Sequence, residues 1–415
     1  MRIAVVGLGY MGLPMAALLA RAGHEVVGID LRPAAIDAVN AGHADFPEPG
    51  LNDWVREAHA SGRLKAIMGG EALPQNLAKG WAEAWLISLP TPVDHTTHTA
   101  DMGAVRAGVH SIIPLLAGHE LVILESTSPL GATKAEVYDI IAAQDSALAD
   151  KLDIVFCPER AIPGNTLHEM EHNDRLVGGL TPKATARGVA LYQTFCKGTV
   201  VGCTAAEAEM VKLVENASRD VQLAFANELS LVCQAVGLNV RNIIALANRH
   251  PRVNILQPGA GVGGHCIAVD PWFIVQAAPE CTPLMQTARA VNDGKPAWVV
   301  AQVQVACASK PQATVACLGL AYKADVDDLR ESPAIEVVQR LKHAGYSLKI
   351  VEPHLTTWAE PLADLNEAIA MADVVVTLTG HSVFKQLPEG ALHGKTLIDA
   401  AGIYPNRTDA TVRVA

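Results

Sequence analysis

Residues 2–12 read "RIAVVGLGYMG", and this stretch decides the fold expected for the first part of the chain. An apolar run typical of a strand breaks into Gly7, Gly9 and Gly12, a helical stretch follows, and a second strand, "EVVGID", ends at Asp30. The glycines permit a tight turn and the close approach of a pyrophosphate, to which the helix N-terminus offers amide donors. A GxGxxG motif inside such a βαβ unit predicts a dinucleotide-binding site.

Two charged residues indicate which dinucleotide binds. Asp30 can accept hydrogen bonds from the adenosine ribose hydroxyls and would repel a 2′-phosphate, which favours NAD over NADP. Arg32 lies close by in the sequence and weakens that preference slightly. The predicted cofactor is therefore NAD.

Three further apolar runs alternate with helical stretches and end in polar or turn residues, namely "AWLISLPTP", "LVILESTSP" and "LDIVFCPER". This pattern is typical of a parallel sheet whose ligand lies at the carboxyl ends of the strands. Thr91, Thr127 and Glu159 are thus candidates to line one crevice. Taken singly, each is more typical of a turn or a helix cap.

Residues 204–237 form the clearest predicted helix, with a capping box of Thr204 and Glu207 at its start and Gly237 at its end. It is apolar nearly all round, so we expect it to run between domains and to be covered by a second subunit. Lys212, Asn216 and Arg219 nevertheless share one face. A buried ammonium needs a polar partner, whereas a solvated stripe is the alternative, chiefly for Arg219.

The fold class predicted from these patterns is α/β, with two Rossmann-like doubly wound domains joined by a long central helix and a helical middle domain. The second α/β unit begins near residue 311 and includes a helix with Pro333 near its start. The expected domains are an NAD-binding domain (1–203), a central helical domain that mediates dimerisation (204–298) and a C-terminal Rossmann-like domain (299–415).

The composition bounds the class of protein. A net charge of −11 over 415 residues argues against a nucleic-acid or membrane-surface binder, since both need basic patches. No apolar run is long enough for a membrane span, and eight cysteines without a CxxC pair fit a soluble protein of the reducing cytoplasm. His95 and His98 form a loose pair without a third ligand, so no metal site is predicted.

Residues 261–271, "GVGGHCIAVDP", place Cys266 after a glycine-rich turn and four residues before Asp270. A cysteine is as often a small buried apolar residue as a reactive one. The surrounding motifs favour a reactive one. GLGYMG, "ESTSPLG", "CPERAIPG", "KLVENASRD", "NRHPRVNILQPGAGVGGHCIAVDP" and "GLAYKADVDDLRES" occur in the order seen in the UDP-glucose/GDP-mannose dehydrogenase family, which the chain resembles over nearly its whole length.

That resemblance implies two successive NAD-dependent oxidations of a sugar-nucleotide C6 alcohol, to the carboxylate. By matching motif positions, Cys266 would attack the intermediate aldehyde, and the resulting thiohemiacetal would be oxidised to a thioester. Lys212 would move a proton or hold the developing oxyanion. Asp270 would orient water or the substrate hydroxyl together with Thr127 and Asn216, and Glu159 would help to hydrolyse the thioester.

The resemblance also implies contacts for both ligands. The substrate contacts would be Arg160, Ala161, Lys212, Asn216, Arg219, His250, Arg252, Gly263, Tyr322 and Lys323. The NAD contacts would be Gly7, Gly9, Tyr10, Met11, Gly12, Asp30, Arg32, Thr91, Thr127 and Arg330. In family dimers, residues similar to His250 and Arg252 reach the neighbouring subunit's site, so the expected partners are a UDP-sugar and a second copy of the chain, in a homodimer or a higher oligomer.

Two positions depart from the family pattern. Ala260 replaces a frequent proline, and Pro405 stands where relatives tend to carry a substrate-binding arginine, for which Arg407 is the possible substitute. The resemblance of the middle segments implies UDP-N-acetylmannosamine as the sugar nucleotide, with UDP-glucose, UDP-N-acetylglucosamine and GDP-mannose as alternatives. A two-electron β-hydroxyacid dehydrogenase and a catalytically silent NAD-binding protein are the other functions considered, and neither needs Cys266.

Overall fold

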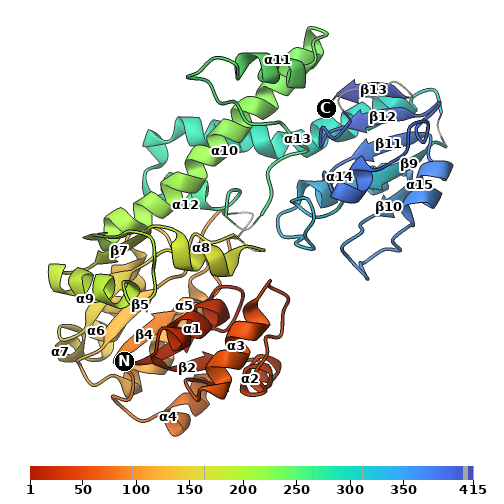
Figure 1. Cartoon of the computed structure of the whole chain (residues 1–415). Coiled ribbons are helices and arrows are strands. Elements are labelled where there is room, and N and C mark those ends of the chain that lie inside the picture. The colour runs from red at the N-terminus through yellow and green to blue at the C-terminus, as the bar shows by residue number, and fades with distance from the viewer. Residues whose placement is uncertain (95–96, 163, 265, 311, 405–409, 415) are drawn as a thin grey trace. The chain divides into compact units, whose positions relative to one another are not determined.

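The computed structural model describes residues 1–94, 97–162, 164–264, 266–310, 312–404 and 410–414. The chain divides into two compact units, Met1–Val214 and Glu215–Ala415. Each contains a largely parallel sheet with helices on both faces, which confirms the predicted α/β class with two Rossmann-like sheets (Figure 1). Among the described residues, no helix has the length and apolar character needed to cross a membrane.

The first unit is built on an eight-stranded sheet of order β3-β2-β1-β4-β5-β6-β7-β8. Its strands are β1 (Arg2–Val6), β2 (Glu25–Asp30), β3 (Leu64–Met68), β4 (Ala84–Ile87), β5 (Leu121–Leu124), β6 (Asp153–Phe156), β7 (Arg175–Gly179) and β8 (Val200–Thr204). Only the β6–β7 pair is antiparallel. The direction of strand succession reverses between β1 and β4, and ligands of doubly wound folds bind at such a point.

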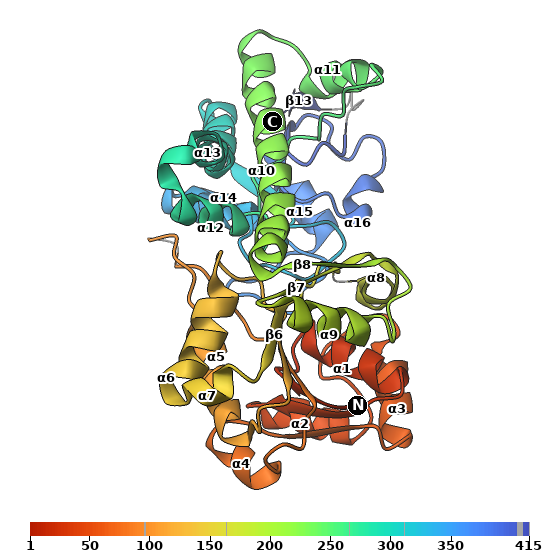
Figure 2. The ribbon, with the colours of Figure 1, turned by 90° about the vertical axis from the view of Figure 1, so that its left-hand side faces the viewer.

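Successive strand residues point to opposite faces, and helices cover both. The helices are α1 (Gly12–Arg21), α2 (Pro33–Asn40), α3 (Leu51–Ala60), α4 (Leu73–Asn76), α5 (Gly103–Ile112), α6 (Asp139–Gln144), α7 (Ser146–Ala149), α8 (Thr166–His172) and α9 (Pro182–Tyr192). Ile3 and Val5 pack into the core under α1, α3 and α9, whereas Ala4 and Val6 pack into the core under α5, α6 and α7. Figure 2 shows these two helical layers on either side of the sheet.

The long helix α10 (Ala205–Ala235) confirms the helix predicted over residues 204–237. The capping box is present, because the backbone N–H of Thr204 donates to the Glu207 carboxylate at 2.8 Å and the N–H of Glu207 donates to the Thr204 hydroxyl at 3.2 Å. Gly237 adopts a φ of 74°, the left-handed conformation that ends many helices. The helix therefore begins and ends where its capping residues require.

The second unit carries a five-stranded parallel sheet of order β10-β9-β11-β12-β13. Its strands are β9 (Thr314–Leu318), β10 (Ser347–Val351), β11 (Val374–Thr377), β12 (Thr396–Asp399) and β13 (Thr411–Val414), and its other helices are α11 (Val240–Ala247), α12 (Asp270–Ala277), α13 (Pro283–Cys307), α14 (Pro333–His343), α15 (Leu365–Met371) and α16 (Ser382–Lys385). Helices α13 and α14 share one core with the sheet, and α15 and α16 share the other.

Helix α13 runs through the domain boundary that was expected between residues 298 and 299. Val299 and Val303 on this helix pack into the core of the C-terminal sheet, so the end of α13 belongs to that sheet's packing. Pro296 lies inside the helix rather than at its end. The division into compact units falls earlier, between residues 214 and 215 within α10.

The turn after β9 repeats the turn after β1. Gly7 and Gly319 have φ angles of 97° and 95°. The N–H of Gly7 donates to the carbonyl oxygen of Ile29 near the end of β2, and the N–H of Gly319 donates to that of Val351 at the end of β10, each at 2.8 Å. The acid that follows, Asp30 or Glu352, accepts the next backbone N–H in both turns. The second turn differs because buried His381 bonds to Glu352 at 3.1 Å. The acid of the second sheet is therefore already engaged within the protein.

Candidate functional site

The glycine-rich turn after β1 has the geometry that a pyrophosphate requires. A Cβ at Gly7 would lie 2.2 Å from the carbonyl oxygen of Ser88, and one at Gly12 would lie 1.9 Å from the carbonyl oxygen of Gly7. Both positions therefore need glycine to pack β1, β4 and α1 together. A Cβ at Gly9 would meet nothing within 4 Å, which leaves open space in front of the α1 N-terminus. These residues fit a bound dinucleotide.

Asp30 lies at the end of β2 with its two carboxylate oxygens directed at this turn. One accepts the N–H of Leu8 and the other accepts the N–H of Arg32, each at 2.8 Å. The Arg32 guanidinium lies 3.3 Å from Asp30 and 2.6 Å from Asp45. Since two carboxylates surround this one cation, the local charge favours a ribose diol over a 2′-phosphate.

Two of the expected cofactor contacts lie together at the same edge of the sheet. Thr91, which follows β4, is buried and donates its hydroxyl to the carbonyl oxygen of Thr127 at 2.7 Å. Thr127 follows β5. Tyr10 is exposed and packs its ring at 4.6 Å between centroids against Phe46. The carboxyl ends of β1, β2, β4 and β5 thus present the predicted cofactor residues of the first unit, whereas Arg330 belongs to the second unit.

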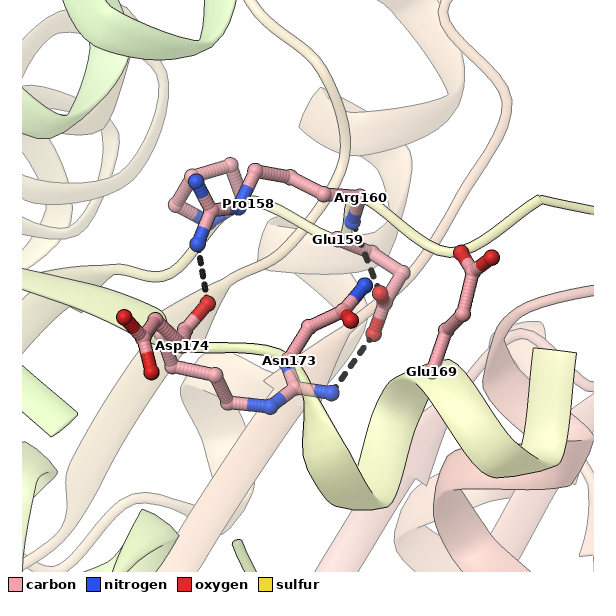
Figure 3. Close-up of a pocket in the computed structure, with 7 residues that line it drawn as sticks. Pro158, Glu159, Arg160, Glu169, Asn173 and Asp174 are labelled. Atoms are coloured by element: carbon pink, nitrogen blue, oxygen red, sulfur yellow. Dashed lines mark hydrogen bonds and ion pairs between the residues drawn. The ribbon is translucent and has the colours of Figure 1, made fainter. Parts of the chain in front are cut away.

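Glu159 follows β6 at the same edge and lines a small pocket with Pro158, Arg160, Glu169, Asn173, Asp174 and Arg175 (Figure 3). One carboxylate oxygen accepts the backbone N–H groups of Arg160 and Ala161 at 2.7 and 2.8 Å. The other accepts the Arg175 guanidinium at 2.9 Å. The Arg160 side chain donates instead to the carbonyl oxygen of Asp174. Glu159 is therefore held by three donors.

The buried groups behind Glu159 have no motif that predicts them from the sequence. Arg175, at the start of β7, lies under Tyr192 with 5.3 Å between the guanidinium carbon and the ring centroid. The Tyr192 hydroxyl donates to Glu125 at 2.6 Å. Burial raises the pKa of Glu125 to about 8, and the charge of Glu159 adds to this rise. Burial alone would raise the pKa of Glu159 too, but Arg175 and the two amides hold it below its ordinary value.

The raised pKa of Glu125 predicts that the stability of the protein depends on pH, and that a Glu125→Gln variant loses this dependence. The folded protein binds the Glu125 proton more tightly than the unfolded chain, so this residue's contribution to stability is lost as pH rises from 4.5 towards 8. We expect the wild-type free energy of unfolding to fall by about 3 kcal/mol relative to the variant between pH 5 and pH 8. Urea unfolding at several pH values measures this, and parallel curves for the two proteins would contradict it.

In the second unit, Asp270 and Cys266 lie on one turn. Asp270 is the first residue of α12 and donates its N–H to the carbonyl oxygen of Cys266 at 2.8 Å. Its buried carboxylate accepts the side-chain amide of Asn216, on α10, at 2.5 Å. The structure thus brings together three residues that sequence analysis assigned to the chemistry. Cys266 is half-buried.

The glycines before Cys266 allow close backbone packing against the segment that precedes α14. A Cβ at Gly263 would lie 2.5 Å from the carbonyl oxygen of Glu331, and one at Gly264 would lie 2.8 Å from the Tyr322 ring. The N–H of Gly264 donates to the carbonyl oxygen of Arg330 at 3.1 Å. Tyr322 and Arg330 both interact electrostatically with Cys266. A predicted substrate contact and a predicted cofactor contact therefore lie beside the cysteine.

The other predicted residues differ in exposure. Lys212 is buried on α10, whereas Arg219 on the same helix is exposed, so the alternative of a solvated stripe holds for Arg219 only. His250 and Arg252 are exposed and adjacent, since the N–H of Arg252 donates to the His250 ring at 3.3 Å. Lys323 is also exposed. Met11 is half-buried, and His95, Pro405 and Arg407 lie outside the described residues.

Comparisons with known proteins place these residues in a family. Models of three domains of the UDP-glucose/GDP-mannose dehydrogenase family match the chain: the NAD binding domain over residues 1–196, the central domain over 206–294 and the UDP binding domain over 316–406. Asp30 and Glu159 fall in the first domain, Cys266 in the second and Arg330 in the third.

Individual relatives cover nearly the whole chain. A UDP-N-acetyl-D-mannosamine dehydrogenase of Escherichia coli (strain K12) is 45% identical and the alignment covers 97% of this chain and 99% of that protein. An NDP-N-acetyl-D-galactosaminuronic acid dehydrogenase of Ralstonia nicotianae is 44% identical, with coverage of 97% and 96%. The structure of a UDP-D-ManNAc dehydrogenase from Pyrococcus horikoshii superposes with a TM-score of 0.90 at 34% identity, covering 100% of this chain and 98% of that one.

Proposed function

Because the chain belongs to the UDP-glucose/GDP-mannose dehydrogenase family, we propose that it oxidises C6 of UDP-N-acetyl-D-mannosamine twice, from the alcohol to the carboxylate, with NAD as the acceptor. The observation that carries this proposal is the Cys266 turn, where a cysteine between packed glycines and a buried Asp270 lies beside Arg330. A two-electron dehydrogenase needs no nucleophilic cysteine. The described residues thus favour the four-electron reaction.

The choice of sugar in this proposal is supported by the names of the relatives. The E. coli relative is named for UDP-N-acetyl-D-mannosamine, and a relative of nearly equal identity is named for N-acetyl-D-galactosaminuronic acid. One name contains an N-acetylated hexosamine and the other the uronic acid of one, which ranks N-acetylated sugars above UDP-glucose and GDP-mannose. The galacto sugar nucleotide is therefore the second candidate.

Residues of the protein provide the following chemistry. Gly7, Gly9 and Gly12 hold the pyrophosphate and Asp30 the ribose of NAD, which when bound accepts a hydride in each oxidation. Lys212 stabilises the oxyanion that forms at C6.

Cys266 supplies the covalent steps. Its sulfur attacks the aldehyde to give a thiohemiacetal, and oxidation of this adduct leaves a thioester. Asp270, held by Asn216, orients the reacting hydroxyl. Glu159 takes a proton from the water that adds to the thioester carbon, the C–S bond breaks, and the carboxylate and the Cys266 thiol are released.

The test is the NADH yield from limiting amounts of each sugar nucleotide. Two NADH per UDP-N-acetyl-D-mannosamine, with little turnover of UDP-glucose, is the expected result. Two NADH from the galacto sugar alone would keep the mechanism and change the substrate. One NADH per substrate from every sugar would overturn the four-electron reaction, and none would favour a silent NAD-binding protein.

The position of Asp30 predicts how cofactor preference changes. Replacing Asp30 by asparagine removes the charge that repels a 2′-phosphate and leaves Arg32 with one carboxylate partner, Asp45, instead of two. We expect the ratio of kcat/KM for NADP to that for NAD to rise by about tenfold or more, equivalent to about 1.4 kcal/mol. Asp45→Asn is the matched control, since it removes a carboxylate from Arg32 but not from the ribose site, and an equal rise in both variants would contradict the role of Asp30.

We further propose that the chain forms a homodimer in the cytoplasm. Val211, Val214, Phe225 and Val232 are exposed on α10 within the described residues, and an apolar stripe on a long helix favours a second copy as its partner. The cysteines other than Cys266 form no disulfide in the described structure, which supports a reducing compartment. Sedimentation of the wild type and of a Phe225→Lys variant tests the dimer, because only the wild type should sediment at twice the mass of one chain.

A further inference from the structure

Two buried carboxylates in the first unit lie close to one guanidinium. Glu125 directly follows β5 and Glu159 follows β6, and the two strands are neighbours in the sheet. Arg175 lies at the start of β7, next to β6. Its side chain is almost fully buried, and it donates to Glu159 at 2.9 Å and to the carbonyl oxygen of Met170 at 3.0 Å. The Arg175 guanidinium is thus close to two buried carboxyl groups, those of Glu125 and Glu159.

The two acids are bound differently. Glu159 receives the guanidinium and two backbone amides, whereas Glu125 receives only the Tyr192 hydroxyl. The second oxygen of Glu125 and the Nε of Arg175 have no hydrogen-bond partner among the described residues. A buried carboxylate with so few donors is more stable with a proton. Glu159, with its three donors, is more stable ionised.

We propose that Arg175 is a positioning residue that keeps Glu159 ionised and fixed for thioester hydrolysis, and that Glu125 retains a proton so that the guanidinium serves Glu159 alone. This inference rests on the proposed function, because it concerns the residue assigned to the last step. Arg175 acts through Glu159 and needs no contact with the substrate. It was not among the residues predicted from the sequence.

The other titratable groups of this cluster do not compete for the cation at neutral pH. Burial raises the pKa of Cys157 to about 12, so its thiol stays protonated. Burial also raises the pKa of Tyr192 well above its ordinary value. Glu125, Glu159 and Arg175 face these two groups, and Arg160, Glu169 and Asp174 line the pocket beside them. Among the carboxylates that line this pocket, Glu159 is the one that accepts a hydrogen bond from Arg175.

A base that must accept a proton from water has to be ionised at the working pH. Without Arg175, burial would leave Glu159 with amide donors alone, and its carboxyl would hold a proton to higher pH. The last step of turnover would then become slow, while both oxidations, which precede it, would still occur. The enzyme would accumulate as a thioester on Cys266.

The experiment compares Arg175→Met and Arg175→Lys with Arg187→Met. Arg187, on α9, bonds Asp153, on β6, at 2.8 Å, and neither residue has a proposed role, so this variant loses an ion pair of similar length elsewhere in the domain. We expect Arg175→Met to lower kcat at pH 7 by about thirtyfold or more and to shift the acid limb of its pH profile upward by at least one unit. Arg175→Lys should show a smaller loss of kcat and a smaller shift of the acid limb than Arg175→Met, because lysine keeps the positive charge.

Rapid mixing and intact-protein mass spectrometry identify the slow step. Arg175→Met should give a burst of two NADH per active site, followed by slow turnover, with the sugar nucleotide attached to Cys266. Arg187→Met should show wild-type kcat, acid limb and burst. An acid limb unchanged in Arg175→Met, with kcat lowered only as much as in Arg187→Met, would overturn the proposal.

A second measurement does not depend on the substrate. Infrared spectra near pH 7 should show the band of one protonated buried carboxyl group in the wild type, which a Glu125→Gln variant loses. The Arg175→Met protein should show a second such band, which an added Glu159→Gln change removes. If no sugar nucleotide yields NADH but these bands appear, the proposed function fails while the charge arrangement stands. If the second band is absent, Arg175 does not control Glu159.

Discussion

A Cys266→Ala variant should lose the four-electron reaction, with kcat lowered by about a thousandfold or more. The reason is chemical, because the second oxidation needs a tetrahedral carbon that carries a hydride, and the thiohemiacetal on Cys266 provides it. Without the thiol the aldehyde can be oxidised only after it is hydrated. We therefore expect at most one rapid NADH per UDP-N-acetyl-D-mannosamine, and the aldehyde should be released or trapped by an added amine.

The matched control is Cys281→Ala, an exposed cysteine of the same unit that lies outside the proposed site. This variant should keep two NADH per substrate and the wild-type rate. Measurement of the NADH yield with limiting substrate, beside the wild type, distinguishes these outcomes. Two NADH at the wild-type rate from the Cys266 variant would show that the cysteine is a structural residue, and the four-electron route would then need another nucleophile.

Local sequence patterns were sufficient to predict those elements whose turn and capping residues lie within the element or next to it. The βαβ unit is confirmed because Gly7, Gly12 and Asp30 must be these residues for the turn to form. Helix α10 is confirmed because the capping box and Gly237 fix its ends. By contrast, β8 was not identified, since its exposed and half-buried residues give no apolar run. The expected boundary after residue 298 falls inside α13, whose last turns pack against the C-terminal sheet.

The candidate site was predictable only where the chemistry lies in one short segment. Cys266 and Asp270 are four residues apart, so a motif brings them together before folding is known. Arg175 contacts groups from the loop after β6 and from α8 and α9, and its position in the sequence has no special feature. Tyr192 lies 67 residues from the glutamate it bonds. Such a cluster forms only when β5, β6 and β7 pair in one particular register, and the spacing of residues in the sequence does not reveal that register.

Breaking the ion pair between Arg289, on α13, and Asp220, on α10, should strongly destabilise the protein. Both side chains are buried, at 3% and 1% exposed, and lie 2.6 Å apart. Asn292 also donates to Asp220, at 2.7 Å. Replacing Arg289 by methionine leaves a carboxylate in the interior without its cation, and we expect the free energy of unfolding to fall by about 3 to 5 kcal/mol.

The exposed pair of Arg340 and Glu336 provides the control, since its side chains are about half exposed and such pairs contribute about 0.3 to 0.5 kcal/mol. Urea unfolding of Arg289→Met and Arg340→Met should therefore differ by several kcal/mol. Arg289→Met should also impair activity, because Asp220 lies one turn beyond Asn216, whose amide holds Asp270. An Asp220→Asn change added to Arg289→Met should recover part of the stability, because it removes the unpaired charge. Equal stability of the two methionine variants would show that neighbouring polar groups, rather than the guanidinium, stabilise the charge of Asp220.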